Sequence, residues 1–217
     1  MRDPSDRIEE PTLRLHWSPR SPFVRKVMVA AHELGLADAM TLVRSVAMMT
    51  KPNPDIMVDN PLSKIPTLVL DDGRVLFDSL TICEYLDFRA GGHRLFPPAG
   101  DARWQAMTDH ALANGLLDLL ILWRNEREKP TDRQTGALLE SFALRVGAGL
   151  DRLEQAASRL GETPFAIGQI TVGCCLSYVD FRFADLAWRA SRPQLAAWHE
   201  TFNARDSARA TVIVDGQ

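Results

Sequence analysis

Patterns typical of β-strands occur only before Ala90 in this 217-residue chain. Residues 13–17 alternate in the manner of a strand, and 41–46 and 65–70 favour two more strands. Between the first two, the apolar residues from Phe23 to Leu34 recur at helical spacing. The first part of the chain therefore mixes short strands with helices.

The turn signal Asp71–Gly73 predicts that 65–70 pairs with 75–77 as a hairpin. Asp78 or Ser79 can then cap a helix that runs to about Ala90. The order is strand, helix, strand, loop or short helix, strand, strand, helix. A right-handed crossover after the first strand makes the first pair parallel, so we expect a small mixed sheet.

After the segment 91–100, which is rich in glycine and proline and suits a linker, only helical spacing remains. Helices are predicted at 102–126, 132–160, 171–183 and 193–203. Thr171 is expected to cap the third of them, and Pro193 is expected to open the fourth. The fold class is thus two-domain, with an α/β domain at 12–90 and an all-α domain at 101–217.

Composition excludes several classes of protein. A formal net charge of -3 and the lack of a Lys/Arg cluster argue against a nucleic-acid partner. The three cysteines suit neither a disulfide framework nor a metal site, and the five histidines are scattered. Met1–Pro11 lacks the apolar core of a signal peptide, and no apolar run is long enough for a membrane span. We expect a cytoplasmic protein without a metal.

Three segments carry specific motifs: 18–27 with Ser-Pro-Phe, 60–68 with Ile-Pro, and 76–79 with Asp-Ser. Together they resemble the glutathione transferase superfamily, and 170–174 stands where that family has a capped helix of its second domain. The resemblance extends from residue 12 onward. It implies a thioredoxin-like βαβ-ββα domain that binds glutathione, followed by an all-helical domain with the acceptor site.

Ser21 precedes Pro22 at the predicted start of a helix, where unpaired N–H groups and the helix dipole favour an anion. The resemblance makes this anion the thiolate of glutathione, to which the Ser21 hydroxyl donates a charge-assisted hydrogen bond. A plain helix cap is the alternative for Ser21. Ser18, at the end of the first strand, competes for the contact with sulfur.

The resemblance also assigns the other glutathione contacts. Ile65-Pro66 matches the cis-proline element of the family, whose backbone pairs with the cysteinyl part of glutathione. Asp78-Ser79 matches the pair that holds the γ-glutamyl carboxylate and ammonium. Phe23 and Lys64 complete the expected set. Lys64 and Lys51 are candidates for the glycyl carboxylate, although a solvated surface lysine is the simpler interpretation of each.

Two features of the second domain follow from the same resemblance. The acceptor site is expected beside the helix at 102–126, with Trp104, Leu116 and Trp123 as candidate lining residues, although core packing also explains such spacing. Glycine often stands in the family where this chain has Ser63, and Cys174 replaces the acidic residue of the expected capping box.

The predicted function is a glutathione transferase-like enzyme of detoxification, homodimeric by family analogy, that attacks a small hydrophobic electrophile. A maleylacetoacetate-type isomerase and an ether-cleaving or dehalogenating enzyme are adjacent alternatives. A non-catalytic binding or regulatory protein of the same fold is the alternative from another class. Disulfide exchange is less expected, because Ser21 stands where a cysteine is needed.

Overall fold

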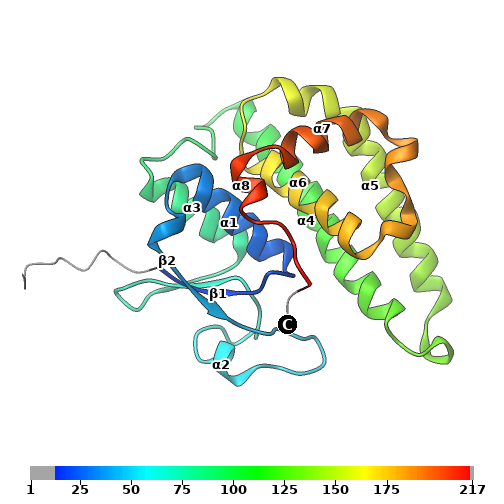
Figure 1. The fold of residues 1–217 in the computed structure, drawn as a ribbon, viewed down its shortest axis with the longest axis horizontal. Helices are drawn as coiled ribbons and strands as arrows, with labels where there is room; N and C mark the ends of the chain where they lie inside the picture. Colours follow the sequence, from blue (N-terminus) through cyan, green and yellow to red (C-terminus); the bar gives the residue numbers. More distant parts are fainter. Residues whose placement is uncertain (1–12, 216–217) are drawn as a thin grey trace, which may run out of the picture.

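The computed structural model describes residues 13–215, and its helices and strands follow the predicted order (Figure 1). Met1–Pro11, the first residue of the expected first domain and the last two of the second lie outside this range. The strands are β1 (Leu13–Trp17), β2 (Met40–Arg44), β3 (Thr67–Val69) and β4 (Val75–Leu76). The α-helices are α1 (Pro22–Leu34), α2 (Pro54–Met57), α3 (Ser79–Arg89), α4 (Asp101–Arg127), α5 (Gly136–Glu162), α6 (Ile167–Arg182), α7 (Pro193–Asn203) and α8 (Asp206–Arg209).

The four strands form one mixed sheet in the order β2-β1-β3-β4. β1 pairs with β2 in parallel and with β3 antiparallel, and β3 pairs antiparallel with β4. Leu13 and Leu15 of the central strand are fully buried, whereas β2 at the edge has no fully buried residue. α1 and α3 lie on one side of the sheet and α2 on the other (Figure 1). The predicted mixed sheet is confirmed.

Helix α1 begins and ends as its sequence predicts. Ser21 caps its first turn, Pro22 is its first residue, and Gly35 follows it with φ 72°. Glycine adopts this left-handed conformation without the steric cost of a Cβ. α1 packs against α3 of its own domain and against α6 of the helical domain. It therefore joins the two halves of the molecule.

The helical domain is built around α6, which packs against α4 and α7. Two of its glycines permit close approach. A Cβ at Gly168 would lie 2.9 Å from the Ala106 carbonyl oxygen, and one at Gly173 would lie 2.4 Å from the Phe202 ring. Within residues 13–215, no helix combines the length and apolarity that crossing a membrane requires.

The predicted cap of α6 is wrong. The helix begins at Ile167, and the cap position is occupied by Ala166, whose N–H donates to Gln169 Oε1 at 3.1 Å. Thr171 lies inside the helix, where its hydroxyl donates to the Ile167 carbonyl and contacts His110 Nδ1. Alanine has no side-chain oxygen with which to cap a helix, so the sequence pattern favours Thr171, five residues further along the chain.

Two other helices differ from expectation. A 3-10 turn at Thr131–Arg133 precedes α5, which begins at Gly136 rather than at 132. The short helix α8 has no counterpart among the predicted helices. It packs against α1. The side chains of Ser207, within α8, and of Arg205, just before it, both bind Glu33 of α1. This anchors the C-terminal segment to the N-terminal domain.

Candidate functional site

The strand register brings the three motif segments to one edge of the sheet, namely the edge at which β1 and β4 end and β3 begins. His16, near the end of β1, lies opposite Thr67, the first residue of β3. Leu76, the last residue of β4, lies opposite Leu68. The segments 18–21, 64–66 and 77–79 therefore leave or enter neighbouring strands at the same edge. Antiparallel pairing of β3 with both neighbours produces this convergence.

Ser21 is half-buried at the N-terminus of α1, and its Oγ accepts a hydrogen bond from Val24 N–H at 3.3 Å. A hydroxyl that accepts one bond still has its proton to donate. Among residues 13–215, no acceptor takes this proton. The predicted capping role is therefore present, and it leaves Ser21 able to donate a hydrogen bond to an anion in front of the helix.

Ser18 is also half-buried, and its Oγ accepts two hydrogen bonds; its own proton, like that of Ser21, has no acceptor among residues 13–215. The Oγ accepts from Arg44 Nη1 at 2.9 Å and from the backbone N–H of Arg20 at 3.5 Å. The Arg44 guanidinium itself lies 5.7 Å from the centre of the Trp17 ring. Ser18 thus ties the end of β1 to the end of β2, and Ser21 is the serine at the N-cap of α1.

The Ile65–Pro66 peptide bond is cis, as the resemblance predicted. Asn60, which is 1% exposed, holds the preceding loop by donating to the Lys64 carbonyl and to Thr67 Oγ1. Ser63 has φ 51°, a left-handed conformation that explains the preference of the family for glycine there. Within residues 13–215, no hydrogen bond uses the backbone N–H or C=O of Ile65. That edge is open to an extended ligand.

Asp78 caps α3, with its Oδ1 accepting from Leu80 N–H at 3.0 Å, and its side chain is exposed. Ser79 is 1% exposed and begins the helix. The free N–H groups of this first turn and the Asp78 carboxylate suit a ligand with both an anionic and a cationic end. Phe23 is half-buried, and both Lys51 and Lys64 are exposed.

Lys26 of α1 lies beneath this edge with no exposed surface. Its Nζ donates to Asn114 Oδ1 of α4 at 2.8 Å and lies 5.6 Å from the centre of the Phe23 ring. Burial lowers the pKa of Lys26, and the nearby Cys83, Asp78, Cys174 and Asp118 oppose that shift. The lysine links the two domains at the cost of placing a charge in the interior.

We predict that Lys26→Met is as stable as the wild type, or up to about 2 kcal/mol more stable, at pH 7. Between the lowered folded pKa and about 10.4 in the unfolded chain, the unfolded state binds more protons, so wild-type stability rises with pH. The variant lacks this increase. Thermal unfolding of both proteins from pH 7 to 10 should show that the stability of Lys26→Met falls relative to that of the wild type.

Lys51→Met, which removes an exposed lysine, is the control and should show no such trend. If the stability difference between Lys26→Met and the wild type stayed constant with pH, burial would not be lowering the pKa of Lys26.

The three residues predicted to line the acceptor site do not share an environment. Trp104 is 69% exposed, whereas Leu116 is 3% and Trp123 is 6% exposed. Leu116 packs against Gly149 of α5, where an added Cβ would lie 2.4 Å from it. The Trp123 ring lies 5.0 Å from the ring of Phe183. Leu116 and Trp123 thus serve the packing of the helical domain, and their contact with a ligand stays a prediction.

Sequence reasoning missed a cavity near Trp123. It lies between the C-terminal ends of α4 and α6, has a volume of about 280 Å³, and is lined by Arg124, Arg127, Glu128, Arg182 and Phe183. Apolar helical spacing does not reveal it, because its lining is mostly charged. The arginines lie on two different helices, α4 and α6, so the sequence alone does not show that they face the same cavity.

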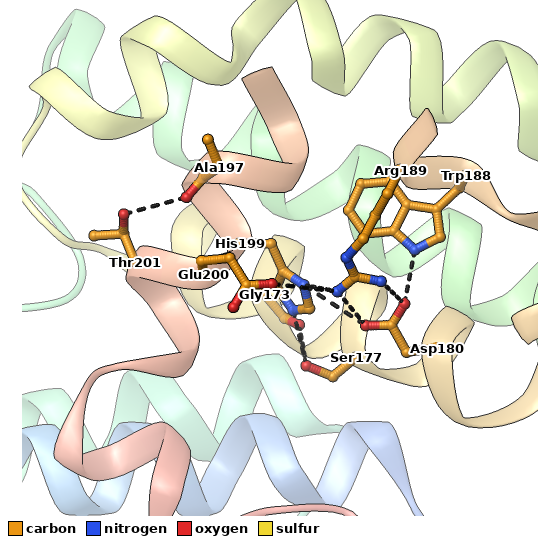
Figure 2. Close-up of polar contacts among 9 residues, drawn as sticks. All are labelled: Gly173, Ser177, Asp180, Trp188, Arg189, Ala197, His199, Glu200 and Thr201. Atoms are coloured by element: carbon orange, nitrogen blue, oxygen red, sulfur yellow. Dashed lines mark hydrogen bonds and ion pairs between the residues drawn. The ribbon is translucent and has the colours of Figure 1, made fainter. Parts of the chain in front are cut away.

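A serine, a histidine and an aspartate also meet between α6 and α7 (Figure 2). Ser177 Oγ lies 3.0 Å from His199 Nε2, and Asp180 Oδ2 lies 3.7 Å from His199 Nδ1. Arg189 Nη2 donates to His199 Nδ1, so the ring proton is on Nε2 and points at Ser177. Ser177 in turn donates to the Gly173 carbonyl.

This arrangement is the reverse of a nucleophilic triad, in which the histidine accepts the serine proton. His199 is fully buried, and burial lowers its pKa to about 4, so the ring stays neutral. Asp180 is occupied by Arg189 and by Trp188 Nε1 (Figure 2). The cluster therefore fastens the end of α6 to α7.

Two further features of the described residues are the grouping of side chains that could ligate a metal and the reactivity of the thiols. Within residues 13–215, no three His, Cys, Asp or Glu side chains are grouped so as to hold a metal ion. Cys83, Cys174 and Cys175 are all buried. Burial raises the pKa of Cys83 to about 12 and also raises the pKa of the other two. None of them is a reactive thiolate at neutral pH.

Comparison with protein families gives two matches. Residues 20–89 match the model described as the N-terminal domain of glutathione S-transferase, and residues 136–201 match the model of its C-terminal domain. The curated "Uncharacterized GST-like protein YibF" of Escherichia coli K12 is 26% identical over 197 residues, which cover 90% of this chain and 96% of that protein.

Solved structures give higher identities. A glutathione transferase family member from Pseudomonas fluorescens Pf-5 with bound glutathione is 40% identical, with a TM-score of 0.89, over 92% of this chain and 98% of that one. A glutathione S-transferase from Methylobacillus flagellatus KT with glutathione bound is 32% identical, with a TM-score of 0.85, over 94% and 100%.

Proposed function

Because the chain belongs to the glutathione S-transferase family, we propose that it binds glutathione at the edge of the sheet where the three motif segments meet. There the protein holds glutathione as the thiolate, which attacks an electrophile lying against the helical domain. The homologues contain bound glutathione. The reaction and the role of each residue are our inference.

The observation that carries the proposal is the Ser21 hydroxyl at the N-terminus of α1, whose proton has no acceptor in residues 13–215. A thiolate placed before this helix gains a hydrogen bond from Ser21 and the favourable end of the helix dipole. A thiol such as that of cysteine has a pKa of about 8.5, and each unit of lowering corresponds to about 1.4 kcal/mol in favour of the thiolate.

The remainder of glutathione has matching partners along the same edge. The open N–H and C=O of Ile65 suit the cysteinyl backbone, which would pair with them as an added strand. The start of α3 suits the γ-glutamyl carboxylate, and the exposed Asp78 carboxylate suits the γ-glutamyl ammonium. Lys64 is our candidate for the glycyl carboxylate.

In the reaction the thiol proton passes to solvent and the sulfur attacks an electrophilic carbon. A carbon–sulfur bond forms, and the bond to the leaving group breaks with its electron pair. Acceleration comes from a larger thiolate fraction and from holding the two reactants together. The serine at position 21 and the burial of all three cysteines disfavour disulfide exchange through a protein thiol.

The test is incubation with glutathione and a panel of aryl halides, activated ethers, alkyl halides and cis-enones, followed by mass spectrometry. We expect glutathione-dependent conversion with a conjugate as the product. A rearranged substrate of unchanged mass would instead indicate the isomerase. Folded protein that neither converts any substrate nor binds glutathione-agarose would exclude the proposal. Binding without conversion would favour a regulatory protein.

A further inference from the structure

The cavity between α4 and α6 is lined mainly by arginine side chains. Of its five lining residues, three are arginines, one is the carboxylate Glu128 and one is Phe183. The proposed glutathione contacts all lie on the N-terminal domain and do not include this cavity. We therefore assign the cavity to the binding of the second reactant, an assignment that rests on the proposed function.

Two of the three guanidinium groups are paired within the protein. Arg127 donates to both carboxylate oxygens of Asp185, at 3.4 and 3.0 Å. Arg124 Nε lies 3.4 Å from Glu128 Oε1, and its other nitrogens donate to Tyr178 Oη and Asn125 Oδ1. These contacts fix the orientation of Arg124 at the cavity wall.

Arg182 is different. Within residues 13–215 it makes no hydrogen bond, and its Nε is buried without an acceptor. Its guanidinium is stacked on the Phe181 ring, 4.0 Å from the centre, and its nearest carboxylate oxygen, Asp215 Oδ1, is 3.9 Å from Nη2. Buried polar groups normally have a partner, and a stacked planar guanidinium is oriented to bind a carboxylate in the bidentate manner.

Asp215 connects the cavity to the residue that precedes Ser21. The Asp215 oxygen that faces Arg182 lies 3.1 Å from Nε of Arg20, the residue before Ser21. Figure 1 shows the C-terminal segment, drawn in red, passing beside the start of α1 on its way from α8. A molecule that reacts in front of Ser21 can therefore extend toward Arg182.

We propose that the electrophile bears a carboxylate, which Arg182 binds with Arg124 beside it. Arg124 and Arg127 are each paired with a carboxylate of the protein at 3.4 Å or less, so Arg182 is the guanidinium that an added anion can engage. The proposal adds an anionic group to the small hydrophobic electrophile expected from the sequence. Asp215 is exposed and competes for Arg182 only weakly, because 3.9 Å exceeds hydrogen-bonding distance.

Two glutathione conjugates that differ in one group test this assignment. S-(4-carboxybenzyl)glutathione carries the carboxylate, and S-(4-methylbenzyl)glutathione is the neutral counterpart. Isothermal titration should show the wild type binding the carboxylate conjugate about tenfold more tightly. Arg182→Met should abolish this preference while it binds the methyl conjugate as the wild type does. Arg145→Met, which removes an exposed arginine of α5, is the matched control and should keep the preference.

Equal affinity of the wild type for both conjugates would overturn the carboxylate assignment and leave the proposed glutathione site intact. The assignment is overturned in the same way if Arg182→Met keeps the full preference. If folded wild type binds neither conjugate, the proposed function itself fails, and the assignment that rests on it fails too.

Discussion

Replacing Ser21 with alanine should lower turnover with glutathione by about 10- to 100-fold and leave the affinity for glutathione nearly unchanged. A hydrogen bond to a charged group contributes about 1.5–3 kcal/mol, and the only part of glutathione to which the Ser21 hydroxyl would donate is the sulfur. The peptide part of glutathione keeps its other contacts. Steady-state kinetics at several pH values and calorimetric titration with glutathione separate the two effects.

The loss of the helix cap is a competing explanation, because Ser21 Oγ also accepts from Val24 N–H. Ser21→Asp distinguishes the two, since aspartate caps a helix as well as serine but repels a thiolate. We expect Ser21→Asp to keep the thermal stability of the wild type and to lose at least as much turnover as Ser21→Ala. Recovery of turnover in Ser21→Asp would reduce Ser21 to a cap. Ser18→Ala losing more than Ser21→Ala would assign the sulfur contact to Ser18.

Replacing Asp78 with asparagine should weaken glutathione binding by about tenfold with little change in the turnover of bound glutathione. The proposed partner of Asp78 is the γ-glutamyl ammonium, and an exposed charge pair of this kind lies at the low end of charge-assisted bonds. Asparagine caps helices as well as aspartate does, so the Leu80 N–H keeps its acceptor. Calorimetric titration and the KM for glutathione measure the change.

Asp72→Asn is the matched control, because it removes another exposed carboxylate of the same domain, one that pairs with Arg74 in the preceding turn. It should bind glutathione as the wild type does. Unchanged affinity in Asp78→Asn would remove Asp78 from the binding site, and a change in turnover without a change in affinity would assign it to the chemical step instead.

The order of strands and helices could be predicted because local signals agreed with one another. Helix α1 is bounded by the cap Ser21, the first residue Pro22 and the left-handed Gly35 that follows it. Helix α7 begins at Pro193 as expected. The mixed sheet followed from the hairpin turn and the handedness of the crossover. Where the local signal was missing, at Ala166, the prediction fell on the wrong residue.

The candidate site likewise has one part that the sequence could predict and one part that it could not. Ser21, Ile65-Pro66 and Asp78-Ser79 are short motifs next to strand ends, so their convergence needs only the sheet topology. The cavity at Arg182 depends on how the ends of α4 and α6 pack, and on a tail that returns to Arg20. Helical spacing can indicate that Leu116 and Trp123 are apolar, but it cannot tell a packed core from a ligand-binding face.

The most direct test of the proposed thiolate site is the pKa of glutathione bound to the protein, followed by the ultraviolet absorbance of the thiolate. The cysteines of the protein do not interfere near neutral pH, because burial raises their pKa. We predict a pKa at least one unit below the value of about 8.5 typical of a free thiol in the wild type, and a higher value in Ser21→Ala. Bound glutathione that titrates like the free thiol in both proteins would contradict the proposed thiolate site.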